Sequence, residues 1–130
     1  MDWYYPILSG ASLENNFETL IKKITDIFWI PDFGVKCVSD EPWVTVAETS
    51  ECSIAFKKIG HEKNAMELLL NAAAIVDKNS VPFMGWQLEE KIYWPEEKPS
   101  WTSAALILAA DANNALTKAS NLFLIKQFNS

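Results

Sequence analysis

Apolar residues in this 130-residue chain recur at every third or fourth position over most of its length. That spacing places them on one face of a helix. The predicted helices cover residues 13–28, 40–59, 62–76, 101–116 and, more briefly, 119–128. Gly34 and Gly60 follow the first two, where glycine commonly ends a helix. Because short loops make successive helices antiparallel neighbours, the sequence predicts an all-α fold built of antiparallel helical hairpins.

Residues 77–99 interrupt this helical pattern. Aromatic and β-branched residues are scattered there among Pro82, Gly85 and Pro95. Two structures fit the segment, a small β-hairpin around residues 89–90 or an ordered irregular loop rich in aromatics. A connection this long in a compact domain is usually either disordered or functional, and its aromatic content argues against disorder.

Composition excludes several classes of protein. A length of 130 residues predicts a single domain, residues 1–130. The net charge of −6 argues against a nucleic-acid partner, and no run of about 20 apolar residues indicates a membrane span. The N-terminus lacks the features of a secretory signal, and Cys37 and Cys52 form no metal-binding or disulfide pattern. We therefore expect a cytoplasmic protein without a metal ion or cofactor.

Three stretches place a tryptophan beside a proline and a carboxylate just ahead of a predicted helix. They are residues 2–6, 40–43 and 94–97. Stacked hairpins would bring these helix starts to one end of the molecule. The resulting surface of indole rings and carboxylates suits a small neutral polar ligand such as a sugar.

The order of these stretches resembles the C-terminal portion of a bacterial family of prenyltransferase-like α/α toroids. The match runs through residues 1–10, 38–49 and 94–111, and it covers about the last third of that family's length. The resemblance implies that residues 1–130 form part of a toroid of helical hairpins. Glucoamylase-like toroids are distant analogues, and the placement of residues 94–97 is similar to that of their base loop.

A glycosidase needs two carboxyl groups facing each other across the sugar. Glu48 and Glu97 are the candidate catalytic pair. The candidate ligand-binding residues come from the three stretches, from the aromatic loop and from the start of the 101–116 helix: Trp3, Tyr4, Asp40, Trp43, Trp86, Trp94 and Trp101. Structural roles compete with these assignments, since Asp40 also fits a helix N-cap and Glu97 also fits the positive end of a helix dipole.

Two functions remain open. The favoured one is a non-catalytic or vestigial toroid fragment that binds a small ligand or associates with itself. A cut toroid exposes an apolar flank, so we expect a homodimer or higher homo-oligomer that uses residues 13–28 and 122–128. The alternative is a carbohydrate-active, glycoside hydrolase-like enzyme fragment that uses the paired carboxylates.

Overall fold

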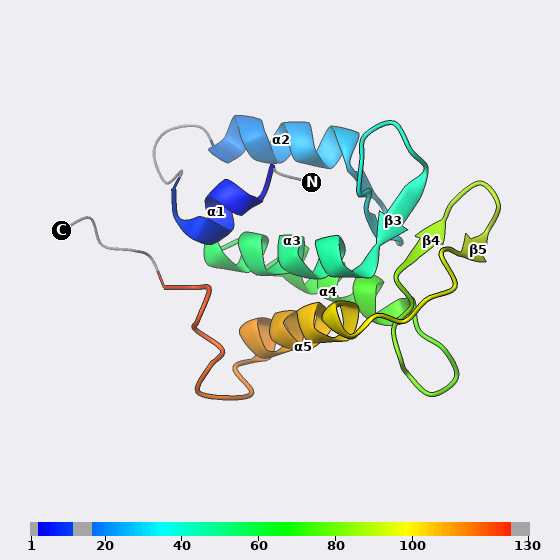
Figure 1. Cartoon of the computed structure of the whole chain (residues 1–130). Helices are drawn as coiled ribbons and strands as arrows, with labels where there is room; N and C mark the ends of the chain where they lie inside the picture. Colours follow the sequence, from blue (N-terminus) through cyan, green and yellow to red (C-terminus); the bar gives the residue numbers. More distant parts are fainter. Residues whose placement is uncertain (1–2, 12–16, 126–130) are drawn as a thin grey trace.

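The computed structural model describes residues 3–11 and 17–125 of the chain (Figure 1). Within these residues it contains five helices and five short strands. The helices are α1 Tyr5–Ser9, α2 Phe17–Ile27, α3 Val46–Lys58, α4 Glu62–Ala74 and α5 Ser100–Asn114. The strands are β1 Trp29–Ile30, β2 Gly34–Val35, β3 Trp43–Thr45, β4 Gly85–Gln87 and β5 Ile92–Tyr93.

Helix α3 is the central element, packed against α4 and α5, with α1 lying against it as well (Figure 1). A helix with neighbours on several sides buries most of its circumference rather than one stripe. Small polar side chains fit this position because they can bond between helices. The Ser53 hydroxyl on α3 donates to the carbonyl of Ala65 on α4 at 2.6 Å, and it accepts from Asn113 Nδ2 on α5 at 2.9 Å. These bonds fix the three helices relative to one another.

The strands form two small antiparallel sheets near the N-terminal end of α3 (Figure 1). One sheet pairs β1 with β2, and the other has the order β3-β4-β5, with Val44 opposite Trp86. The prediction of an all-α fold is therefore wrong, and the fold is mixed. The β-branched residues Val44 and Thr45 are favoured in strands, and their pairing with β4 makes α3 begin at Val46 rather than near Asp40.

The structure also bears on the predictions for residues 85–93, for the last helix and for the toroid arrangement. Of the two structures predicted for this segment, a β-hairpin or an irregular loop, residues 85–93 form the hairpin, since β4 pairs with β5. The prediction of a last helix is wrong for the residues that the structure describes there. Residues 118–124 form turns after Ala115 adopts a left-handed conformation, with φ 52°. Residues 12–16 and 126–130 lie outside the described residues. In the described part of the chain the helices form no ring of hairpins, so the toroid prediction is also wrong.

Asp77 secures the loop that leads into β4. Its carboxylate accepts hydrogen bonds from Lys98 Nζ and from the backbone amides of Asn79, at 2.8 Å, and Val81, at 3.0 Å. The hydrogen bond from Lys98 is the largest cause that lowers the pKa of Asp77 from 3.8 to about 2. The loop is therefore held by a carboxylate that stays ionised in moderate acid.

We expect Asp77→Asn to lower the melting temperature at neutral pH. Because the folded-state pKa lies below the unfolded value, the stabilisation by Asp77 is present above about pH 4 and is lost as the pH falls through about 2. The difference in melting temperature between wild type and variant should therefore shrink as the pH falls from about 4 to about 2. Asp40→Asn removes an exposed loop acid that makes no side-chain hydrogen bond to the described residues, so it is the control and should leave the melting temperature at neutral pH nearly unchanged. A constant difference down to pH 2 would contradict this assignment.

Candidate functional site

The carboxylate of Glu51, at the middle of α3, receives two tyrosine hydroxyls. Tyr4 Oη donates to Glu51 Oε2 at 2.6 Å, and Tyr5 Oη donates to the same oxygen at 3.1 Å. Burial is the largest cause that raises the pKa of both tyrosines, and the neighbouring Glu51 charge raises both further. Both hydroxyls therefore remain protonated donors at neutral pH. Among the described residues the hydrogen bonds to this carboxylate go to Oε2, which leaves Oε1 as an acceptor for a ligand.

Two further contacts place α1 so that Tyr5 can reach Glu51. Tyr4 is buried, with an exposed fraction of 1%, and belongs to the core cluster that also contains Phe56. Lys58 Nζ on α3 donates to the carbonyl of Leu8 at 2.7 Å. The position of the Glu51 site therefore depends on the docking of α1 onto α3, which joins residues nearly 50 positions apart in the sequence.

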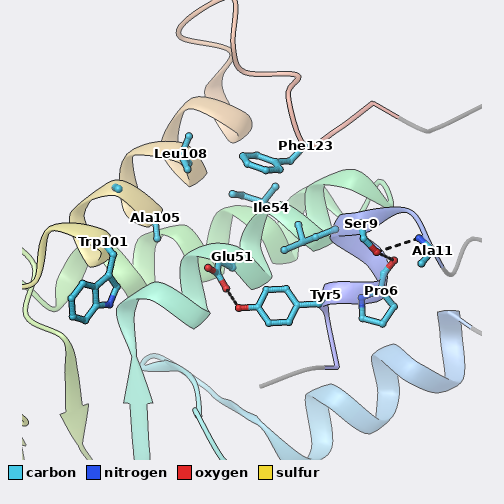
Figure 2. A pocket seen from close by; sticks show the side chains of 12 residues that line it. Tyr5, Pro6, Ser9, Ala11, Glu51, Ile54, Trp101, Ala105, Leu108 and Phe123 are labelled. Atoms are coloured by element: carbon cyan, nitrogen blue, oxygen red, sulfur yellow. Dashed lines mark hydrogen bonds between the residues drawn. The ribbon is translucent and has the colours of Figure 1, made fainter.

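An open groove of about 740 Å³ lies beside Glu51, between α1 and α5 (Figure 2). Tyr5 and Pro6 form one wall, and Trp101 and Leu108 form the other. The indole of Trp101 is unusually accessible for so large an apolar side chain, with an exposed fraction of 61%. We call this space the Glu51 groove. An apolar cleft with a few convergent polar groups is the usual form of a small-ligand site.

Glu48 lies one helical turn before Glu51 and is engaged differently. The Thr45 hydroxyl donates to Glu48 Oε2, and the Cys37 thiol donates to Oε1 at 3.6 Å. Burial, then the charge of Glu48, raises the pKa of Cys37 to about 11, so the thiol stays protonated. The spacing Thr45-x-x-Glu48 matches a capping box, although here the two side chains bond each other. Protein donors thus occupy both Glu48 oxygens.

A second cavity, of about 550 Å³, lies between residues 37–43 and the β4–β5 hairpin. Trp43 and Trp94 line it, and their rings meet edge to face, with centroids 5.3 Å apart. We call it the loop–hairpin cavity. Glu41 and Glu90 are its acidic lining residues, and Cys37 contributes to its wall.

The remaining predicted site residues lie elsewhere. Trp3 stacks on Phe28, with ring centroids 5.3 Å apart, and Trp86 is half-buried, with its ring edge-on to Tyr93. Asp40 and Glu97 are exposed in loops, and neither they nor Glu48 line either cavity. The structure thus brings Trp43 together with Trp94 in one cavity, and it places Trp101 in the other.

Glu51 and Tyr5 were not predicted as site residues from the sequence. The available signal was the spacing Glu48-x-x-Glu51, which places two carboxylates on one face of a helix. That spacing alone does not distinguish a ligand-facing acid from a solvated one. The decisive observation is the pair of tyrosine hydroxyls that converge on Glu51, which required the position of α1.

Within residues 3–11 and 17–125, no cluster of three or more His, Cys, Asp or Glu side chains is arranged to hold a metal ion. Within the same residues no helix has the length and apolar character needed to cross a bilayer.

Comparison with known proteins gives one informative relationship. No protein-family model matches the chain. Over 123 residues it is 36% identical to a protein of Mycolicibacterium hassiacum described as an MMP endo-(1,4)-3-O-methyl-alpha-D-mannosidase. The alignment covers 95% of this chain but 34% of that protein, so the chain spans about a third of its relative's length.

This relationship corrects two expectations from the sequence. The resemblance to prenyltransferase-like toroids is wrong, because the relative that was found is a mannosidase and no family model supports the toroid assignment. The favoured function, a non-catalytic or vestigial module, is also contradicted. A relationship to a sugar-cleaving enzyme supports the alternative, a carbohydrate-active fragment. The chain is thus similar, over nearly its whole length, to one third of an endo-mannosidase.

Proposed function

We propose that this chain provides the glycan-binding surface of a carbohydrate-active enzyme of the glycoside hydrolase type, and that the Glu51 groove holds the sugar. The observation that carries the proposal is the open carboxylate oxygen of Glu51, fixed by Tyr4 and Tyr5 at the edge of an apolar groove. Sugar hydroxyls donate well to a carboxylate, and such charge-assisted bonds are stronger than neutral ones. Relationship to an endo-mannosidase supports the same class of ligand.

The apolar character of the groove favours an O-methylated sugar. Apart from Glu51, the Tyr5 hydroxyl, Ser9 and the indole N–H of Trp101, the described side chains that line it are apolar, among them Ile54, Leu108 and Phe123. A methyl ether replaces a hydroxyl donor by an apolar group, which is favourable to bury against such walls. A 3-O-methylated α-(1,4)-linked mannose chain, the substrate in the relative's description, is therefore the proposed ligand.

Hydrolysis requires a proton donor and a second carboxylate that acts as a base or a nucleophile. Glu51 is the groove-lining carboxylate, and we assign it direct contact with the sugar. Glu48 lies one helical turn away, but it does not line the groove and both its oxygens accept protein donors, so we assign it no part in the reaction. Glu97, an exposed residue in the loop before α5, does not line the groove either, and its catalytic role stays a prediction from the sequence.

Calorimetric titration with a 3-O-methylated α-(1,4)-manno-oligosaccharide tests this proposal. Glu51→Gln keeps the shape of the side chain and removes its charge, so we expect affinity to fall about tenfold or more, the equivalent of one charge-assisted hydrogen bond. Glu67→Gln, at an exposed acid of α4, is the matched control and should bind like the wild type. The unmethylated oligosaccharide should bind more weakly. Equal binding by Glu51→Gln and the wild type would refute the assigned role of Glu51.

We also propose that the chain associates with itself. Several large apolar side chains near the C-terminal end of the described chain are mostly exposed, including Ile107 (67%), Leu116 (68%) and Leu122 (64%). Exposed apolar patches favour association. Light scattering after size exclusion at tens of micromolar should report a dimer or larger species, and Leu122→Lys should shift it towards monomer. A wild-type monomer at that concentration would rule the proposal out.

A further inference from the structure

The loop–hairpin cavity is built as a rigid recess rather than a gap between mobile loops. Trp43 Nε1 donates to the carbonyl of Trp94 at 2.6 Å, and the amide of Leu88 donates to the carbonyl of Pro42 at 2.8 Å. Both bonds join the 37–43 loop and β3 to the β4–β5 segment. The walls are therefore held in place before any ligand arrives, which lowers the entropic cost of binding.

Gly85 shows how closely the indole of Trp43 is seated. A Cβ atom at position 85 would lie 2.6 Å from Trp43 Nε1 and 2.4 Å from the carbonyl oxygen of Val44. Both distances are shorter than real contacts, so only glycine permits the ring to lie against β4. The sheet and the indole thus form one packed wall of the cavity.

The chemistry of the lining matches a neutral, hydroxyl-rich ligand. Trp94 is 51% exposed, and an aromatic face of this kind can stack on the apolar face of a sugar ring. Glu41 and Glu90 supply carboxylate acceptors. Gln87 Oε1 already accepts from the amide of Glu90 at 2.6 Å, so the Gln87 amide group remains available as a donor. Among the residues that the structure describes, the lining contains no Lys or Arg, which argues against phosphate and other anionic ligands.

We propose that the loop–hairpin cavity is a second sugar-binding subsite, which holds one pyranose unit stacked on Trp94. The hydroxyl groups of the sugar donate to the carboxylates of Glu41 and Glu90. The side-chain amide of Gln87 donates to the ring oxygen or a hydroxyl oxygen of the sugar. The volume of about 550 Å³ lies within the usual range of small-ligand sites, roughly 300–1,000 Å³. The inference rests on the proposed carbohydrate function for the class of ligand, but it concerns a different place on the molecule from the Glu51 groove.

Cys37 gives this proposal a specific reporter. It is half-buried and lines the loop–hairpin cavity but not the Glu51 groove, whereas Cys52 is fully buried. Iodoacetamide at pH 9 should therefore alkylate Cys37 selectively, slowly because little of the thiol is ionised. Mass spectrometry measures the rate with and without the 3-O-methylated α-(1,4)-manno-oligosaccharide.

A bound pyranose should shield Cys37 from the reagent. With sugar at ten times its dissociation constant for the cavity, the rate should fall about tenfold. The same protection should persist in Trp101→Ala, which impairs only the groove, and should vanish in Trp94→Ala. Leu70→Ala, at an exposed apolar residue of α4, is the control for a general effect of truncation and should be protected like the wild type.

The two measurements, calorimetry and the rate of Cys37 alkylation, distinguish a failure of the second subsite from a failure of the proposed function. If calorimetry shows that sugar binds but the Cys37 rate is unchanged, the second subsite is refuted and the proposed function stands. If no sugar binds at all, both proposals fail. If tetramethylammonium protects Cys37 and the sugar does not, the cavity is an aromatic cation site and the sugar assignment is overturned.

Discussion

Replacing Gly34 by alanine is expected to destabilise the fold by about 3–5 kcal/mol, a large part of the stability of an ordinary domain. Gly34 has a φ of +124°, which side-chain-bearing residues rarely adopt. A Cβ there would also lie 2.6 Å from Thr49 Oγ1 and 2.9 Å from Thr49 Cγ2. The substitution therefore adds backbone strain and forces a buried side chain to move.

Thr49 cannot move without breaking hydrogen bonds, because its hydroxyl both accepts and donates one. It accepts from the amide of Val35 at 2.9 Å and donates to the carbonyl of Thr45 at 2.6 Å, and its exposed fraction is 0%. Displacing it would leave a buried amide in the β1–β2 sheet without a partner. The penalty thus combines strain with the loss of hydrogen bonds that join the sheet to α3.

Gly60→Ala is the matched control for the strain alone. Gly60 also has a positive φ, of 86°, but a Cβ at that position meets nothing within 4 Å. We expect a loss of roughly 1–2 kcal/mol, the usual cost of the left-handed conformation for an L-residue. Urea denaturation of both variants measures the difference. Equal losses for Gly34→Ala and Gly60→Ala would contradict the contact with Thr49.

Trp101→Ala is expected to weaken binding of the methylated manno-oligosaccharide roughly 10–30-fold. A sugar stacked on the indole removes on the order of 60–80 Å² of apolar surface from water, which contributes about 1.5–2 kcal/mol. Trp101 is 61% exposed, so its truncation should leave the core intact and the melting temperature nearly unchanged.

Leu70→Ala provides the comparison for Trp101→Ala in calorimetric titration. Leu70 has nearly the same exposed fraction, 62%, but lies on α4 and does not line the Glu51 groove. Its removal should change neither the affinity nor the enthalpy of binding. If Leu70→Ala and Trp101→Ala weaken binding equally, the indole has no specific role in the groove.

Helices α4 and α5 were predictable because helical periodicity is a local property of the sequence. The predicted helix 62–76 agrees closely with α4, Glu62–Ala74, and 101–116 with α5, Ser100–Asn114. The strands were not predictable in the same way. Each has two or three residues, too few for an alternating pattern, and β3 pairs with a segment about 40 positions away.

The candidate site depends on similar long-range contacts. Trp43 and Trp94 were singled out for their residue types, and the structure places both in the loop–hairpin cavity, although their part in binding stays a prediction. Glu51 can be recognised as a site residue only from the folded chain, in which Tyr4 and Tyr5, at the start of α1, donate to its carboxylate. Nothing in the local sequence around Glu51 distinguishes it from Glu48, whose oxygens are occupied by Thr45 and Cys37.

The most direct test of the central claim, that the Glu51 groove binds a glycan, is an NMR titration of the ¹⁵N-labelled chain with 3-O-methylated α-(1,4)-manno-oligosaccharide. We predict saturable shifts of the Trp101 indole and of the backbone amides of Tyr5 and Glu51, with the Leu70 amide unaffected. The indole signal is assigned by its loss in Trp101→Ala. Saturating sugar that leaves the Trp101, Tyr5 and Glu51 signals in place would contradict the account.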